Sequence, residues 1–439
     1  MIERGKGGCL NVGFISTRFR GLDGVSLEAA KWAAVLKEFR HRCFWFAGEL
    51  DKDPGESMLV PEAFFAHPAA AELNAALFHT AKRSRKLGDA IQRQKELLKD
   101  KLYEFIERFK IDLIIPENVL SLPMHIPLGI AVAELIAETG IPTIAHHHDF
   151  YWERPRFLLN ACQDILDMAF PPNLPSIRHV VINSMAQAEL AAKRSIAARL
   201  VYNVMDFEGK PEKPRESETQ FRRNMGFQKE DILILQPTRV VFRKGIEQAI
   251  YLVQLLNLPS VKLIVSHSPG DEGIAYTEWV KEWGCRQGVP LHFIHNRLHE
   301  ESRFSPQGER LYSLWEVYPH MDLITYPSIY EGFGNAFLEA VYFKKPLLVN
   351  RYSVFIVDIE PKGFDVVAID GYLTKEAVRQ VAEVLMSPQR KKQMVEKNFE
   401  LARKYFSFQL LRKELFNLIS AFFGMCPQPG LLQRLLGRS

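Results

Sequence analysis

Residues 323–345 read LITYPSIYEGFGNAFLEAVYFKK, in which the signals of a strand, a glycine-containing turn and a helix follow one another. Apolar β-formers give way to turn residues, and helix formers begin near Ala336. The first turn of a helix carries unpaired backbone N–H groups and the positive end of the helix dipole. Gly332 and Gly334 also let a phosphate or a sugar approach the main chain closely. The stretch therefore predicts an anion-binding turn between a strand and a helix.

Two glutamates accompany this turn. Glu331 lies just before it, and Glu339 lies about one turn into the helix. Because a loop-to-helix junction separates them, we expect the two carboxylates to contact different parts of one elongated ligand. A carboxylate accepts hydrogen bonds from sugar hydroxyls but repels phosphate. The expected ligand has a diphosphate in its middle and a hydroxylated ring at each end.

The segment PSIYEGFGNAFLEA, with seven residues between its two glutamates, resembles the donor-sugar motif of retaining glycosyltransferases of family 4. The resemblance implies that Glu339 holds the ribose of a nucleotide-sugar and that Glu331 lies near the transferred sugar. It also implies that sugar or phosphate is contacted by the intervening segment, namely Gly332, Phe333, Gly334, Asn335 and Ala336. The alternative is an ordinary strand-to-helix turn with solvated glutamates.

A second basic turn follows the predicted strand DILILQ, in the sequence PTRVVFRKG. Arg239 and Lys244 are spaced so that both side chains can converge on one diphosphate, and they match the Arg and Lys pair of family 4. Two fixed cations offset the charge of a departing nucleoside diphosphate, so no metal ion and no cofactor are expected. Arg243 is expected to point elsewhere. A solvated basic turn is the alternative.

Three consecutive histidines, 146–148, end a predicted strand. Because side chains alternate between faces in an extended segment, the three are not expected to bind one metal ion. A histidine at the carboxyl end of a strand is placed to face a ligand. His148-Asp149 resembles the His-Asp of family 4, where the histidine meets the donor sugar. His146 is the alternative residue, and a packed, hydrogen-bonded histidine is the alternative interpretation for either.

Glycines and arginines near predicted strand ends give further candidates. By the same resemblance, Gly24 in the loop after the first strand belongs to the donor site, although a simple tight turn is also possible. Guanidinium groups beside aromatic rings suit a sugar phosphate. We therefore predict an acceptor pocket that contains Arg18, Arg20, Arg154 and Arg156, with His146 beside it. Surface arginines in ion pairs or at a domain interface are the alternative.

Composition is that of a globular protein of two or three domains, with 47% hydrophobic and 25% charged residues in a chain of 439. The net charge of +4 is too small to predict nucleic-acid binding. Five widely spaced cysteines fit the reducing cytoplasm, and the sequence has no convincing signal peptide. No apolar run is long enough to span a bilayer. The short tail at 430–439 predicts peripheral membrane contact at most.

Strand and helix signals alternate along the chain, which predicts an α/β fold with parallel sheets. The resemblance implies the GT-B fold, in which two Rossmann-like doubly wound domains face each other across the active-site cleft. Residues 1–207 would form the acceptor domain and residues 208–405 the nucleotide-sugar domain. Residues 406–439 would form a helical segment that crosses back to the first domain.

The implied activity is metal-independent transfer of a hexose, with retention, from a nucleotide-sugar to an acceptor hydroxyl. UDP-glucose is the first expected donor and GDP-mannose the second. The acceptor is a small sugar with or without a phosphate, a polyol acid or a lipid-linked glycan. Three alternatives stay open: a nucleotide-sugar epimerase, a sugar phosphorylase on the same fold, and a non-catalytic partner subunit that retains a donor site.

Overall fold

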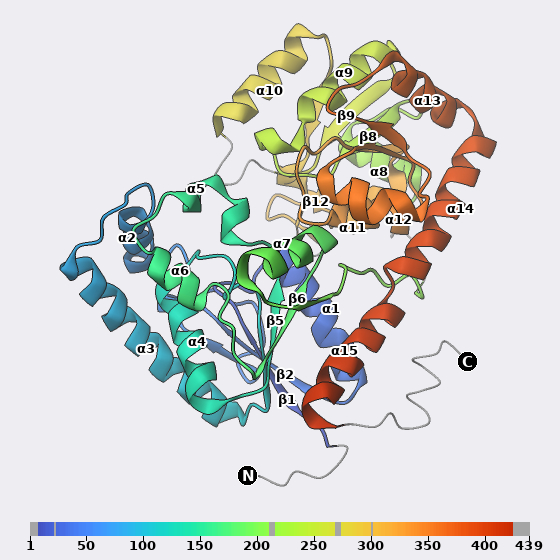
Figure 1. The fold of residues 1–439 in the computed structure, drawn as a ribbon. Helices are drawn as coiled ribbons and strands as arrows, with labels where there is room; N and C mark the ends of the chain where they lie inside the picture. Colours follow the sequence, from blue (N-terminus) through green and yellow to red (C-terminus); the bar gives the residue numbers. More distant parts are fainter. Residues whose placement is uncertain (1–7, 22, 210–215, 268–273, 300–301, 425–439) are drawn as a thin grey trace. The chain divides into compact units, whose positions relative to one another are not determined.

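The chain folds into two compact units in the computed structural model (Figure 1). The structure describes residues 8–21, 23–209, 216–267, 274–299 and 302–424, so the predicted tail contact at 430–439 lies outside the described residues. Unit 1 combines Met1–Val204 with Phe408–Ser439, and unit 2 spans Met205–Ser407. Unit 1 is therefore built from two segments that are far apart in the sequence.

A seven-stranded parallel sheet forms the centre of unit 1, in the order β3-β2-β1-β4-β5-β6-β7. The strand order reverses between β1 and β4, as it does in Rossmann-like folds, where ligands bind at the carboxyl ends of the strands beside such a switch point. The strands are β1 (Asn11–Ile15), β2 (Arg42–Ala47), β3 (Ser57–Leu59), β4 (Leu113–Pro116), β5 (Thr143–His147), β6 (Ile177–Val181) and β7 (Ala198–Leu200).

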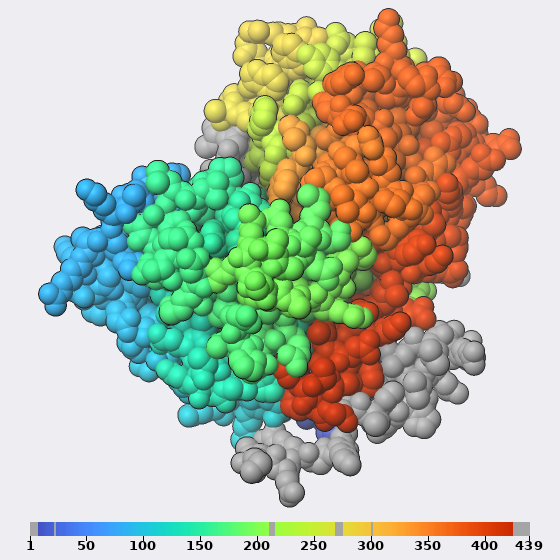
Figure 2. Space-filling view, viewed as in Figure 1, coloured from blue at the N-terminus to red at the C-terminus, as the bar shows by residue number. Residues whose placement is uncertain are grey.

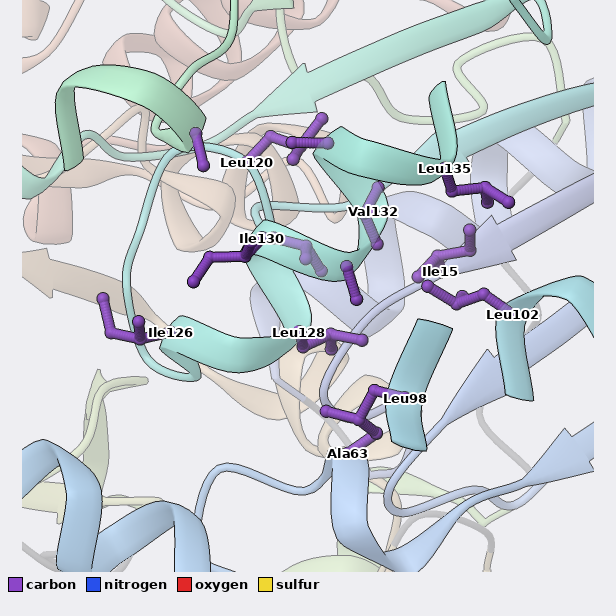
Figure 3. Close-up of a cluster of buried hydrophobic side chains, with 14 of the residues drawn as sticks. Ile15, Ala63, Leu98, Leu102, Leu120, Ile126, Leu128, Ile130, Val132 and Leu135 are labelled. Carbon is purple, nitrogen blue, oxygen red and sulfur yellow. The ribbon is translucent and has the colours of Figure 1, made fainter. Parts of the chain in front are cut away.

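Helices cover both faces of this sheet. They are α1 (Gly24–Glu38), α2 (Pro68–Leu77), α3 (Arg85–Phe109), α4 (Ile126–Thr139), α5 (Pro155–Leu158), α6 (Gln163–Ala169), α7 (Ser184–Arg194) and α15 (Phe408–Phe423). One core lies between the sheet and helices α2, α3, α4 and α6, and Figure 3 shows part of it, including Leu98 and Leu102 of α3 and Leu128 of α4. A second core contains α1 and α15.

The last helix of the described chain, α15, belongs to the second core of unit 1. It buries Leu411, Leu415, Leu418 and Ile419 along one stripe, at the spacing of an amphipathic helix. These side chains join a cluster that includes Phe14 of β1 and Trp32 of α1. The other side of the helix forms part of the surface, drawn in red in Figure 2.

A six-stranded parallel sheet forms the centre of unit 2, in the order β10-β9-β8-β13-β14-β15, which again reverses between its third and fourth members. Its strands are β8 (Ile232–Gln236), β9 (Val261–Val265), β10 (Leu291–Phe293), β13 (Leu323–Tyr326), β14 (Leu347–Asn350) and β15 (Val367–Ile369), beside a small hairpin of β11 (Arg303–Phe304) and β12 (Arg310–Leu311).

The helices of unit 2 are α8 (Glu218–Met225), α9 (Ile246–Leu256), α10 (Ile274–Arg286), α11 (Leu314–Val317), α12 (Asn335–Tyr342), α13 (Lys375–Met386) and α14 (Pro388–Tyr405). Residues from α9, α13 and α14 cover the buried strands and form one core with them. Among the described helices of both units, none combines the length and the apolar character that crossing a membrane requires.

Candidate functional site

The basic turn of unit 2 follows β8, at the switch point of its sheet. A short 3₁₀ helix, η3 (Phe242–Lys244), leads into α9 through Gly245, whose φ is 61°. A Cβ at Gly245 would lie 2.5 Å from the carbonyl oxygen of Pro327, the residue that follows β13. Only glycine tolerates both this left-handed backbone and this approach. Gly245 therefore brings the turn after β8 against the turn after β13.

Gln236, at the end of β8, holds this turn in place. Its buried amide donates to the Thr238 hydroxyl at 2.9 Å and to the carbonyl of Lys244 at 3.3 Å. Its amide oxygen accepts from the hydroxyl of Thr325 in β13 at 2.8 Å. Sequence reasoning did not identify Gln236, although a single amide at the end of an apolar strand was a visible signal.

Lys244 and Glu331 form a buried ion pair between the two turns. Burial disfavours ionisation of Glu331, but Lys244 and Arg243 outweigh it and hold the pKa of this carboxyl below its usual value. Burial lowers the pKa of the Lys244 ammonium, although the neighbouring Glu331 carboxylate acts to raise it.

The expectation that Arg243 points elsewhere was wrong. Its Nη1 lies 3.6 Å from Oε2 of Glu331 and donates to the Tyr330 carbonyl at 3.3 Å. The Ile329 amide explains this, because it binds the carbonyl of Arg243 at 2.8 Å and keeps the two turns in register.

The glycine turn that precedes α12 is braced by a tyrosine. Gly334 has a φ of 122°, and a Cβ there would lie 2.5 Å from the hydroxyl oxygen of Tyr352. That hydroxyl donates to the Phe333 carbonyl at 2.7 Å. Helix α12 then begins at Asn335, so the turn and the first amides of the helix are held in a fixed conformation. Such a turn provides the backbone N–H groups that an anion requires.

Glu339 lies in α12 and is fixed by a second tyrosine. The hydroxyl of Tyr318, which is completely buried, donates to Glu339 Oε2 at 2.8 Å. Sequence reasoning identified neither Tyr318 nor Tyr352, because both come from other elements and their contacts depend on the tertiary fold.

Positive charge dominates this part of unit 2. Arg239 is exposed, and with Arg243 and Lys244 it gives three cations beside the carboxylates of Glu331 and Glu339. Burial, with Lys244 and Arg239 as further causes, lowers the pKa of His267 to about 4. The turns after β8 and β13 thus form a cationic, glycine-lined arrangement that suits a diphosphate.

In unit 1, the histidine segment ends β5 beside the end of β4. As the alternation predicted, His147 lies on one face of the strand, where its Nε2 is 2.9 Å from Nδ1 of His179. His146 and His148 share the opposite face. Oε2 of Glu117, the residue after β4, lies 2.9 Å from both His146 Nδ1 and His148 Nε2. Sequence reasoning missed Glu117, although an acidic residue directly after the strand LIIP was a signal.

These three side chains gather one carboxylate and two imidazoles, with one ligand atom from each within 4.8 Å of the others. Zinc is among the ions that such a donor set can hold. The expectation that no metal is needed stays a prediction.

The remaining predicted residues of unit 1 lie in several places. Gly24 is exposed at the first position of α1. Three of the four arginines form ion pairs with different carboxylates: Arg18 with Asp23 at 3.6 Å, Arg20 with Glu49 at 2.9 Å, and Arg154 with Asp149 at 2.8 Å. Arg156 is exposed and contacts the sulfur of Met124 at 2.9 Å. Their roles stay predictions.

Comparison with known proteins agrees with this geometry. Residues 217–401 match the family model described as glycosyl transferases group 1. The chain is 33% identical over 428 residues to mannosylglucosylglycerate synthase of Thermotoga maritima, covering 90% of this chain and 96% of the relative. It is 30% identical over 441 residues to the protein of the same name from Petrotoga mobilis, covering 92% of this chain and all of the relative.

Among solved structures, the chain is similar to Anabaena HepE in complex with UDP and glucose. The TM-score is 0.63 at 14% identity, over 94% of this chain and 100% of HepE. This likeness concerns the fold, and it confirms the prediction of a GT-B protein with two parallel-sheet units. The relatives extend the match over nearly the whole chain. The protein therefore belongs to the glycosyl transferases group 1 family and is a hexosyltransferase.

Proposed function

We propose that this enzyme transfers a mannosyl group from a nucleotide-activated mannose to glucosylglycerate and so forms mannosylglucosylglycerate. The observation that carries the proposal is the match to two synthases of that name, which extends over 90% or more of this chain. Their name favours GDP-mannose, the second expected donor, over UDP-glucose. Glucosylglycerate belongs to the polyol acids that the sequence left open as acceptors.

The contacts in unit 2 support a specific role for each residue. Arg239 and Lys244 would neutralise the leaving diphosphate, and Glu339 would bind the ribose. When the donor arrives, Lys244 would exchange its carboxylate partner for a phosphate, which would free Glu331 to accept hydrogen bonds from sugar hydroxyls. The amides from Gly332 to Asn335 would hold the sugar and the phosphate. Two protein cations then perform the electrostatic task that a metal ion has in other enzymes.

In unit 1, we propose that His148 contacts the transferred sugar and that the arginines predicted for the acceptor bind its carboxylate. Retention fits attack from the same face as the departing phosphate, which then accepts the proton of the acceptor hydroxyl. The anomeric proton of the product, observed by NMR, tests retention: the new glycosidic bond should be α, as in the donor. A cytoplasmic location stays a prediction from the cysteines.

The first experiment is a transfer assay with GDP-mannose and UDP-glucose, each with glucosylglycerate, in buffer containing EDTA or magnesium. We expect a mannosylated product from GDP-mannose, detected by mass spectrometry, at a rate that magnesium does not change. In parallel, GDP should raise the melting temperature more than UDP or ADP. Transfer from neither donor would contradict the proposal. Turnover without an acceptor would indicate an epimerase, and turnover that requires free phosphate would indicate a phosphorylase.

Substitution of the proposed donor residues gives a second test. Lys244→Ala should lower kcat by about 10²–10³-fold, because the developing charge on the diphosphate loses a fixed cation. Glu339→Ala should mainly weaken nucleotide binding, measured by calorimetry with GDP. Lys281→Ala, on the exposed face of α10, is the matched control and should leave both values unchanged. Full activity in the first two variants would contradict the site assignment.

A further inference from the structure

Glu117 is a completely buried carboxylate without a role in the proposed transfer. It is 1% exposed, and its neighbour His146 is also buried and stacked on Trp32 with ring centres 4.1 Å apart. His148 is the member of this cluster that reaches solvent, with 7% of its surface exposed. A ligand can therefore contact His148, whereas Glu117 can affect the ligand only through its contact with His148.

Asn118, which follows Glu117 after β4, holds the main chain of the histidine segment by hydrogen bonds. The Asn118 amide donates to the carbonyl of His146 at 2.9 Å, and the Asn118 side-chain oxygen accepts from the amides of His148 and Asp149 at 2.9 and 3.2 Å. Asn118 has a φ of 63°, a conformation that asparagine tolerates better than most residues. The end of β4 thus fixes both the main chain and the imidazole of His148.

We propose that Glu117 is a positioning residue that holds the imidazole of His148 by its Nε2–H, so that its orientation and tautomer are set before substrate binds. The inference rests on the proposed function in one respect, the contact between His148 and the transferred sugar. An ionised carboxylate in such a buried place is costly without partners. Glu117 Oε2 lies 2.9 Å from both imidazoles and forms a hydrogen bond with His148 Nε2, which explains how this carboxylate is retained.

The geometry favours a hydrogen bond between Glu117 and His148 over a bound metal. Zinc–ligand bonds of about 2.0–2.1 Å in a tetrahedron place neighbouring ligand atoms about 3.3 Å apart. Both nitrogen-to-oxygen distances to Glu117 Oε2 are 2.9 Å, shorter than that spacing, and the contact with His148 Nε2 is a hydrogen bond. Other charged groups nearby belong to ion pairs: Glu28 with Lys31 of α1 at 2.9 Å, and Asp149 with Arg154 at 2.8 Å.

A double-mutant cycle tests whether Glu117 acts through His148. Glu117→Gln should lower kcat by about 10²-fold, because a small misplacement of a group at the reacting centre has an effect of that size. The KM for the donor and the GDP-induced shift in melting temperature should stay unchanged. In a His148→Ala background, Glu117→Gln should cause no further loss. Glu134→Gln, which removes a partner of Lys95 and Lys99, is the matched control and should keep wild-type kcat.

If the double variant loses kcat by the product of the two single losses, Glu117 acts independently of His148 and the proposal is overturned. An unchanged kcat in His148→Ala would overturn it as well. A measurement without substrate separates this inference from the proposed function. In ¹⁵N-histidine NMR spectra, His148 should carry its proton on Nε2 in the wild type and on a mixture of both nitrogens in Glu117→Gln. An unprotonated Nε2, or one equivalent of metal that copurifies and is lost in Glu117→Gln, would contradict it. Failure of transfer to glucosylglycerate alone would count against the proposed function instead.

Discussion

Gly334 lies where the chain changes from turn to α12, and its geometry explains why the turn carries glycine. Its φ of 122° suits glycine, and the Tyr352 hydroxyl oxygen lies 2.5 Å from the position of a Cβ. The same hydroxyl binds the Phe333 carbonyl. A side chain at 334 would therefore disturb both the turn and its brace.

We expect Gly334→Ala to destabilise unit 2 by about 3 kcal/mol, combining backbone strain with the displaced tyrosine, and to weaken GDP binding. Gly371→Ala is the matched control, because φ is 78° there but no atom lies within 4 Å of the new Cβ. Strain alone should destabilise this control by about 1–2 kcal/mol. Urea unfolding and calorimetry with GDP measure the two effects, and equal losses in both variants would contradict the role of Tyr352.

At the residue scale, the sequence predicted those members of the candidate site that share a local pattern. Lys244 and Glu331 were identified from the turns that carry them, and the structure places them in contact. Tyr318 and Tyr352 were not identified, because an aromatic residue in an apolar segment gives no sign that its hydroxyl will meet a distant turn. Glu117 was also missed: its place directly after β4 is a local signal, but its partners lie in the neighbouring strand.

At the scale of elements, α15 is a helix whose packing can be tested. Leu415 is completely buried in the second core of unit 1, whereas Leu410 is 36% exposed on the same helix. Leu415→Ala should destabilise unit 1 by about 2–5 kcal/mol through a cavity, and Leu410→Ala by less than about 1 kcal/mol. Hydrogen exchange followed by mass spectrometry should show faster exchange in β1 and β2 for Leu415→Ala. Unchanged exchange there would show that α15 does not support this core.

Elements with strong periodicity and clear ends were predicted well. Helix α13 (Lys375–Met386) has ends that local sequence signals define, because Thr374 caps its start and Ser387-Pro388 ends it. In contrast, the segment 49–78 mixes prolines with apolar residues and carries no clear strand or helix signal, although the structure shows β3 and α2 there. Strand β3 has three residues at the edge of the sheet, so its pairing with β2 rather than its own sequence defines it.

At the scale of the whole molecule, buried neutral histidines make stability depend on pH. Burial lowers the pKa of His125 in unit 1 and of His320 in unit 2 to about 4, below the usual 6.5. Between pH 4 and pH 6.5 the unfolded chain therefore binds more protons than the folded protein. The contribution of these histidines to the free energy of unfolding is fully present above pH 6.5 and decreases as the pH falls toward 4. His125 adds a local reason, because its Nδ1 accepts from the Leu128 amide at the start of α4 and loses this ability on protonation.

We expect the urea midpoint to decrease between pH 7 and pH 4.5. His125→Asn keeps a side-chain acceptor at the start of α4 but does not titrate, so it should reduce this decrease by up to about 3 kcal/mol. Measurement of the wild type and of His125→Asn at both pH values separates this effect from a loss of stability that does not depend on pH. An identical pH dependence in the variant would show that His125 does not contribute.

The division of unit 1 into two segments has a consequence for how the protein is made. A ribosome releases the amino-terminal part of this unit first, then all of unit 2, and only afterwards α15. Unit 2 is continuous in the sequence, so its nascent chain has every strand and helix it needs before unit 1 does. Until Leu411 and Leu415 emerge, the apolar surface around Phe14 and Trp32 lacks its cover. For this enzyme the domain that is translated first is thus the one that is completed last.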